Sequence, residues 1–148
     1  MHSVKHLLSE RFFTSVTLLA SSVTVTACGI PVGGGVPNDA KPTGTIVATG
    51  TISGSGGGKT SSGNATVYAN GASYILRLDS LSVANEAGLQ VILDMQSGPP
   101  ALTASLRAPS GNQNYNVAGI VGTFVKVEIY STSTQTDYAT ATLVYPGP

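Results

Sequence analysis

The stretch Thr123-Phe124-Val125-Lys126-Val127-Glu128-Ile129-Tyr130 shows the pattern that decides the fold of this chain. Val125, Val127 and Ile129 alternate with two charged residues, so that apolar and polar side chains recur with a period of two. Successive side chains of a β-strand point to opposite faces of the sheet. The stretch therefore predicts a strand of an antiparallel sheet that has one buried face and one face in water.

Similar short runs of β-branched or alternating apolar residues occur from residue 45 to the end of the chain, and no window after residue 27 has a sustained helical period. Asn70-Gly71 separates two of them and predicts a hairpin with a type I′ turn, whose two central residues both need positive φ. Short strands separated by turn residues predict an all-β fold, an antiparallel β-sandwich or barrel of roughly eight short strands. Besides residues 123–130, the expected strands are residues 45–52, 65–69, 72–78, 89–93, 102–107, 115–117 and 138–145.

The glycine-rich segment of residues 53–58 predicts a mobile loop between the first two strands. Lys59-Thr60 follows it, and together they look like a phosphate-binding loop. That pattern needs glycine at position 53, where the chain has Ser53, and it needs a helix to follow. A strand is expected there instead, so the segment is interpreted as a hairpin loop.

The beginning of the chain has the features of a bacterial lipoprotein signal. A leader with Lys5 and Arg11 and an interrupted apolar core ends in Val25-Thr26-Ala27, and Cys28, the only cysteine, follows. Its apolar part is too short and too rich in Ser and Thr for a membrane span. We expect residues 1–27 to be the signal peptide and Cys28 to be the acylated N-terminus, because two or more acyl chains give stable anchoring. The alternative is an ordinary secretory signal with a chance cysteine near its cleavage site.

Lipidation of Cys28 implies a location on the extracytoplasmic face of the cell membrane or the outer membrane. Residues 28–44, with their Gly33-Gly34-Gly35 run and three prolines, predict a flexible tether. Residues 45–148 then form a single β domain of ordinary size.

The composition argues against several classes of function. The sequence holds seven Lys and Arg against seven Asp and Glu, with no basic patch, so nucleic acid is not an expected partner. Both histidines, His2 and His6, lie in the expected signal peptide. The mature chain would therefore lack the groups for Ser-His-Asp or Cys-His nucleophiles, and for zinc or haem sites built on His or Cys. We expect neither an enzyme nor a resident cofactor or metal.

Three carboxylates lie at or between the ends of expected strands and are the weak candidates for a ligand or cation site. Asp79 and Asp94 end two strands, and Glu86 lies between them. They could form a paired acid/base site, as in a hydrolase, or a weak Ca²⁺ site. The alternative is that each caps a turn or stays solvated, since their spacing is not diagnostic.

From about Gly63 to Tyr145 the chain resembles the DM-thirteen domain, a β-rich extracytoplasmic module often described as an electron-transfer domain. The resemblance rests on the order and spacing of several blocks across most of the mature chain. These blocks are residues 65–71, Tyr74-Ile75-Leu76-Arg77-Leu78-Asp79-Ser80-Leu81, residues 85–93, Gly111-Asn112-Gln113-Asn114-Tyr115, residues 125–130 and residues 140–143.

The chain departs from that family at the position suspected of redox work. Members usually carry a cysteine just after the strand that ends here at Tyr130, and this chain has Ser131. A hydroxyl cannot cycle between thiol and disulfide or bind a soft metal as thiolate. Glu86-Ala87 also replaces a Gly-Pro pair. The resemblance thus implies the fold, whereas the electron transfer is not carried over.

Together these patterns predict a lipid-anchored β module with a non-catalytic binding or structural role at the cell envelope. Its expected partners are the membrane, through the lipid on Cys28, and an unidentified envelope protein or ligand. The alternative is an accessory domain in an envelope electron-transfer system, in which a partner or bound cofactor supplies the chemistry.

Overall fold

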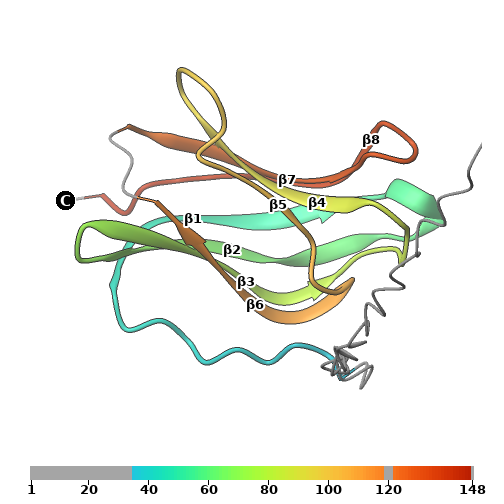
Figure 1. Cartoon of the computed structure of the whole chain (residues 1–148), viewed down its shortest axis with the longest axis horizontal. Coiled ribbons are helices and arrows are strands. Elements are labelled where there is room, and N and C mark those ends of the chain that lie inside the picture. Colours follow the sequence, from blue (N-terminus) through green and yellow to red (C-terminus); the bar gives the residue numbers. More distant parts are fainter. Residues whose placement is uncertain (1–34, 119–121, 148) are drawn as a thin grey trace, which may run out of the picture. The chain divides into compact units, whose positions relative to one another are not determined.

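The computed structural model describes residues 35–118 and 122–147, and the predicted signal peptide and Cys28 lie outside these residues. The described part is all β, as predicted (Figure 1). Its strands are β1 (Thr45–Gly54), β2 (Ser61–Asn70), β3 (Ser73–Ser82), β4 (Leu89–Met95), β5 (Leu102–Ser105), β6 (Ser110–Val117), β7 (Phe124–Ser131) and β8 (Thr136–Thr142).

The eight strands form one antiparallel sheet in the order β5-β4-β7-β8-β1-β2-β3-β6. The sheet curls into a nearly closed, barrel-like shape, with β4, β5, β7 and β8 in its upper part in Figure 1 and the other strands below. The two parts join between β1 and β8, where Ser53 pairs with Thr140 and the backbones of Thr49 and Val144 exchange two hydrogen bonds of 2.9 and 2.7 Å. Strands β5 and β6 are the two edges.

The core fills the interior of this curled sheet. Val127 and Ile129 on β7 are each 1 % exposed, as their alternation predicted, but Val125 is only half-buried. The register between β4 and β7 shifts there, since Asp94 pairs with Lys126 and Met95 with Phe124. This bulge leaves Val125 without a partner on β4 and turns Phe124 inward, so the prediction of an inward Val125 is wrong.

The hairpin between β2 and β3 is confirmed, but its turn is not the predicted one. Asn70 pairs with Ser73, so Gly71 and Ala72 are the central residues. Gly71 has a φ of 63°, whereas neither Asn70 nor Ala72 has positive φ. A type I′ turn centred on Asn70-Gly71 is therefore excluded, and glycine at the first central position is typical of type II′.

The glycine-rich connection between β1 and β2 is packed onto the barrel, contrary to the prediction of a mobile loop. It forms a short 3₁₀ turn, η1 (Gly56–Gly58). A Cβ on Gly56 would lie 2.5 Å from the Cα of Tyr138, and one on Gly57 would lie 2.8 Å from the Cβ of Ala84. Glycine is needed here because a larger side chain could not enter the contact.

Candidate functional site

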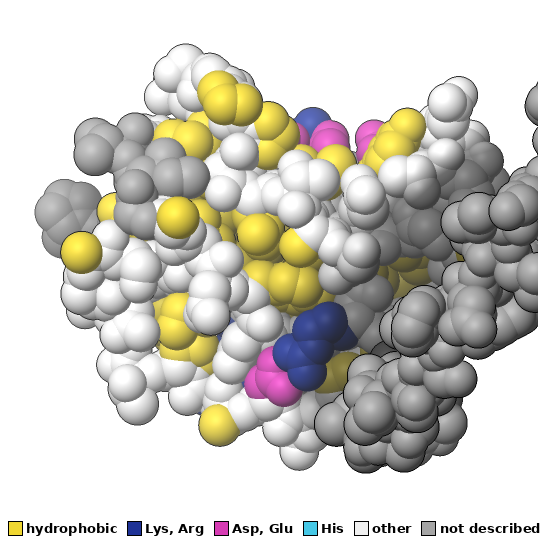
Figure 2. Space-filling model, in the orientation of Figure 1, with side chains coloured by type: hydrophobic (Ala, Val, Ile, Leu, Met, Phe, Trp, Pro, Cys, Tyr) yellow, Lys and Arg dark blue, Asp and Glu magenta, His cyan; other side chains and the backbone are white. Residues whose placement is uncertain are grey.

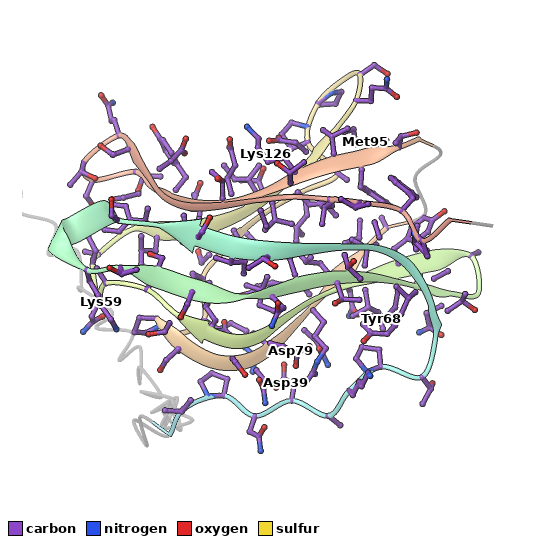
Figure 3. All side chains as sticks on the ribbon, turned by 180° about the vertical axis from the view of Figure 1, so that it is seen from behind. Asp39, Lys59, Tyr68, Asp79, Met95 and Lys126 are labelled. Atoms are coloured by element: carbon purple, nitrogen blue, oxygen red, sulfur yellow. The ribbon has the colours of Figure 1, made fainter. Side chains whose placement is uncertain are left out.

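A segment that we call the strap, residues 36–44, runs along the outside of β6, β3 and β2. The sequence assigned these residues to a flexible tether, and the structure shows them docked on the sheet (Figures 1 and 3). Under the strap, outward-facing Tyr68 and Arg77 are only 3 % and 4 % exposed. Figure 3 shows Tyr68 between the sheet and the strap.

Backbone hydrogen bonds join the strap to the free edge of β6. The Asn112 N–H donates to the carbonyl of Pro37 at 2.7 Å, and the Asp39 N–H donates to the carbonyl of Asn112 at 3.0 Å. The Asn112 side-chain amide also donates to the Asn38 side chain at 2.8 Å. The strap thus adds a short parallel bridge to β6 and satisfies backbone groups that an edge strand otherwise leaves open.

Asp39 is the ionic centre of this contact. Its carboxylate accepts hydrogen bonds from both terminal nitrogens of Arg107, in the connection after β5, and from the Asn114 backbone N–H at 2.8 Å. Hydrogen bonds from the Arg107 side chain and from the Asn114 backbone lower the pKa of Asp39 from its ordinary value. The same bond to Asp39 raises the pKa of Arg107. Such two-pronged Arg–carboxylate pairs fix geometry as well as charge.

Arg77 of β3 holds the strap from beneath. Its Nη1 donates to the carbonyls of Asp39 and Ala40, at 2.9 and 3.0 Å, and to the Asn114 side chain at 3.0 Å. Its Nε donates to the Asp79 carboxylate at 2.7 Å. Asp79, one of the three predicted site carboxylates, therefore serves as the counter-ion of a buried arginine.

The structure does not bring the three predicted carboxylates together. Asp94 of β4 lies 3.5 Å from the Lys126 ammonium, which also pairs with Glu128. The hydrogen bond to Glu128 is the main reason for the raised pKa of Lys126. Four strands separate β3 from β4 in the sheet, and no group of three or more metal-binding side chains gathers anywhere in the described residues. A site built from Asp79 and Asp94 is not assembled.

Glu86 instead lines a concavity next to Arg107. The cavity has a volume of about 280 Å³, and its walls are Asn85, Glu86, Gly88, Leu89 and residues 105–109. On the face that carries β5 and β6, Figure 2 shows basic and acidic side chains in contact beside a stretch of apolar surface. The wall of the concavity combines the cation of Arg107 and the anion of Glu86 with the apolar side chains of Leu89, Leu106 and Pro109. Such a lining suits a polar ligand or a short peptide segment better than a reaction centre.

A hydrogen-bond chain stiffens the wall of this concavity. The Arg107 N–H donates to the Tyr115 hydroxyl at 3.1 Å, and that hydroxyl donates to the Gln113 side chain at 2.8 Å. Gln113, fully buried, donates in turn to the carbonyl of Ala108 at 2.8 Å. Burial raises the pKa of Tyr115, so its phenol stays neutral and keeps its proton for Gln113.

A second, uncharged groove lies across β1, β2 and β8. It has a volume of about 410 Å³ and is larger than the concavity beside Arg107. Its walls are Thr49, Gly50, Thr51, Asn64, Ala65, Thr66, Thr142 and Val144. Because it has no charged or aromatic wall to orient a ligand, we take the smaller concavity beside Arg107 as the candidate binding site.

Ser131, the position at which the resembling family carries cysteine, is buried at the end of β7. It pairs with Leu89 of β4 and Thr136 of β8, and its hydroxyl accepts a hydrogen bond from the Thr134 N–H at 3.2 Å. Serine commonly caps a tight turn in this way. Its place in the fold is structural.

None of the polar residues that organise the site was predicted from the sequence to be a site residue, although Arg77, Asn112 and Asn114 lie in blocks that carry the family resemblance. Arg77 lies in an otherwise apolar run, and Asn112 and Asn114 alternate along their strand. A charged residue inside an apolar strand is a usable signal, but its partner Asp39 is 38 positions away.

No family model, curated protein or solved structure matches this chain. None of the helices in residues 35–118 and 122–147 has the length and apolar character to cross a bilayer. The fold and the site together define the class, which is an antiparallel β-barrel-like module with residues 36–44 fastened to its outer face.

Proposed function

We propose that this chain is a lipid-anchored, extracytoplasmic β module with a non-catalytic binding or structural role at the cell envelope. Support for the anchor comes from the Val25-Thr26-Ala27-Cys28 junction behind a basic and apolar leader.

The non-catalytic part of the proposal rests on one observation: most charged side chains of the domain form ion pairs with one another. Seven of them lie in four ion pairs within the described domain. The pKa of Asp39 is lowered, and those of Arg107 and Lys126 are raised, so each shift holds the charged form. Proton transfer near neutral pH is best served by groups whose pKa is close to that pH. These pairs are suited to holding structure.

The DM-thirteen resemblance is part of the same proposal. It is supported by the all-β architecture and by the strands that its blocks occupy. The electron-transfer alternative is weakened by the chemistry at Ser131, because its hydroxyl is bonded in a turn and cannot act as a thiol. In our proposal any ligand binds in the concavity beside Arg107.

Two measurements on the protein from its native membrane test the proposal. The wild-type chain is expected in the membrane fraction carrying labelled fatty acid, and Cys28→Ser is expected to be soluble or unprocessed. A variant that stays membrane-bound and is cleaved normally contradicts the anchor.

Protein-film voltammetry and metal analysis of the same material test whether the protein takes part in electron transfer. We expect no reversible redox wave and no stoichiometric haem, copper or iron. Finding any of these would make electron transfer the leading interpretation.

A further inference from the structure

The strap begins at one end of the barrel. Gly111, the second residue of β6, is so close to the start of the strap that a Cβ there would lie 2.3 Å from the Pro37 carbonyl oxygen. The connections of residues 55–60, 83–88, 106–109 and 132–135 lie at this same end, because the strand ends that flank them lie in register with one another around the sheet. We call it the proximal end.

The described chain enters at the proximal end and reaches β1 at the other, the distal end (Figure 1). The distal end carries the turn at residues 71–72 and the connection of residues 96–101. Val36, at the start of the strap, is 63 % exposed, so a large apolar side chain stands free at the point where the chain enters.

From this geometry we infer that the proximal end of the barrel faces the membrane, with a lipid surface as its partner. The inference rests on the proposed acylation of Cys28. Gly35 follows Cys28 by seven positions. A fully extended chain spans at most about 3.5 Å per residue, so these seven positions reach about 25 Å.

That reach decides which orientations are open to the domain. β2 has ten residues and at about 3.4 Å per residue is about 30 Å long, and connections of the chain project beyond both of its ends. An inverted domain, with its distal end on the lipid, would hold the start of the strap farther from the membrane than the tether can extend. A free tether of residues 28–44 would reach about 60 Å and would permit either orientation.

Docking of the strap therefore shortens the chain between Cys28 and the folded domain, and this limits the orientations that the domain can take at the membrane. Arg77, Arg107 and Asn112 hold it at several points, so the effective tether ends at Gly35 and not at β1. The concavity lined by Glu86 and Arg107 then lies on the membrane side of the domain, and the connection that contains Ser97 lies on the far side.

Energy transfer to labelled lipid tests this orientation on the full-length, acylated protein. Cys28 is the only native cysteine, so a single added cysteine can be labelled selectively once Cys28 is acylated. Ser55→Cys reports on the proximal end and Ser97→Cys on the distal end, and both positions are exposed. In vesicles that contain acceptor-labelled lipid, we expect several-fold more efficient transfer from position 55 than from position 97.

A lengthened tether is the matched control, because it leaves every residue of the domain unchanged. Inserting about twelve Gly and Ser residues after Gly34 extends the reach to about 65 Å. The difference between the two positions should then largely disappear. Equal transfer from the two positions in the membrane-bound wild-type protein overturns the inference and leaves the anchor intact. Recovery of the unmodified protein in the soluble fraction overturns both.

Discussion

Asp39 and Arg107 are 68 positions apart in the chain, yet their side chains form a two-pronged ion pair that fastens the strap beside β6. Both groups are partly exposed, with side-chain exposures of 25 % and 45 %. The pair brings together the residues before the first strand and the connection between β5 and β6.

Glycine at position 111 is expected to be required for docking of the strap. Gly111 and Gly98 have positive φ, of 99° and 88°, so alanine should strain both backbones by about 1 kcal/mol. Only at Gly111 would the new Cβ also meet strap backbone, since Gly98 has no neighbour within 4 Å. Gly111→Ala should therefore speed proteolysis within residues 36–44, and Gly98→Ala should not. Equal protection of the two variants would show that the strap is not held at this point.

The Asp39 contact should weaken in acid. The folded-state pKa of Asp39 is lowered by Arg107 and Asn114, so its contribution to stability is present above the unfolded value of 3.8. That contribution is lost as the pH falls through the lowered folded value. Asp39→Asn should cost about 1 kcal/mol at neutral pH, because the pair is partly exposed, and less at low pH. Chemical denaturation at several pH values measures this, and a cost that does not change with pH would contradict it.

Arg77→Ala is expected to destabilise the domain more than Asp39→Asn does. It removes the donor to two strap carbonyls and leaves Asp79 without its cation, at a cost of about 3 kcal/mol. Arg77→Lys should fall between the wild type and the alanine variant, because an ammonium group cannot reproduce the planar fork of guanidinium. Urea unfolding of the three proteins gives the order. A lysine variant as stable as the wild type would mean that charge alone suffices.

A charge at Val127 should abolish folding. Val127 is 1 % exposed in the core, and an unpaired buried carboxylate costs several kcal/mol, comparable to the stability of a whole domain. Lys126→Gln on the opposite face should change the melting temperature only slightly, because it removes an exposed cation from Asp94 and Glu128. Thermal melts of Val127→Asp and Lys126→Gln provide the comparison. Similar effects of the two substitutions would place the strand one residue out of register.

Ser131→Cys should give an inert thiol. The side chain is fully buried, so the new sulfur should resist maleimide in the native protein and react only after unfolding. Loss of the hydrogen bond from the Thr134 N–H should cost about 1 kcal/mol. Mass spectrometry after timed labelling, with Ser97→Cys as the exposed control, measures the protection. Rapid labelling at position 131 would show that this end of β7 opens readily.

The fold class follows from local features that the sequence carries by itself. The alternation around Val127 and Ile129 gives the strand and its buried face, because a period of two is a property of the extended backbone. The turn signal at Gly71 likewise places a hairpin, since glycine accepts positive φ without a steric cost. Such local patterns do not reveal where the pairing between two strands becomes irregular. The bulge at Val125, which turns Phe124 inward, depends on the neighbouring strand β4.

Only the tertiary structure brings the residues of the site together. The Asp39 carboxylate accepts from Asn114, 75 positions away, and Arg77 reaches back 38 positions to the Asp39 carbonyl. The same strand order keeps Asp79 and Asp94 apart, although both end strands in the sequence. Composition marked the strap as a flexible tether, because glycine and proline prevent regular structure. Its docking depends on the free edge of β6 and the buried Arg77, which exist only after distant strands have paired.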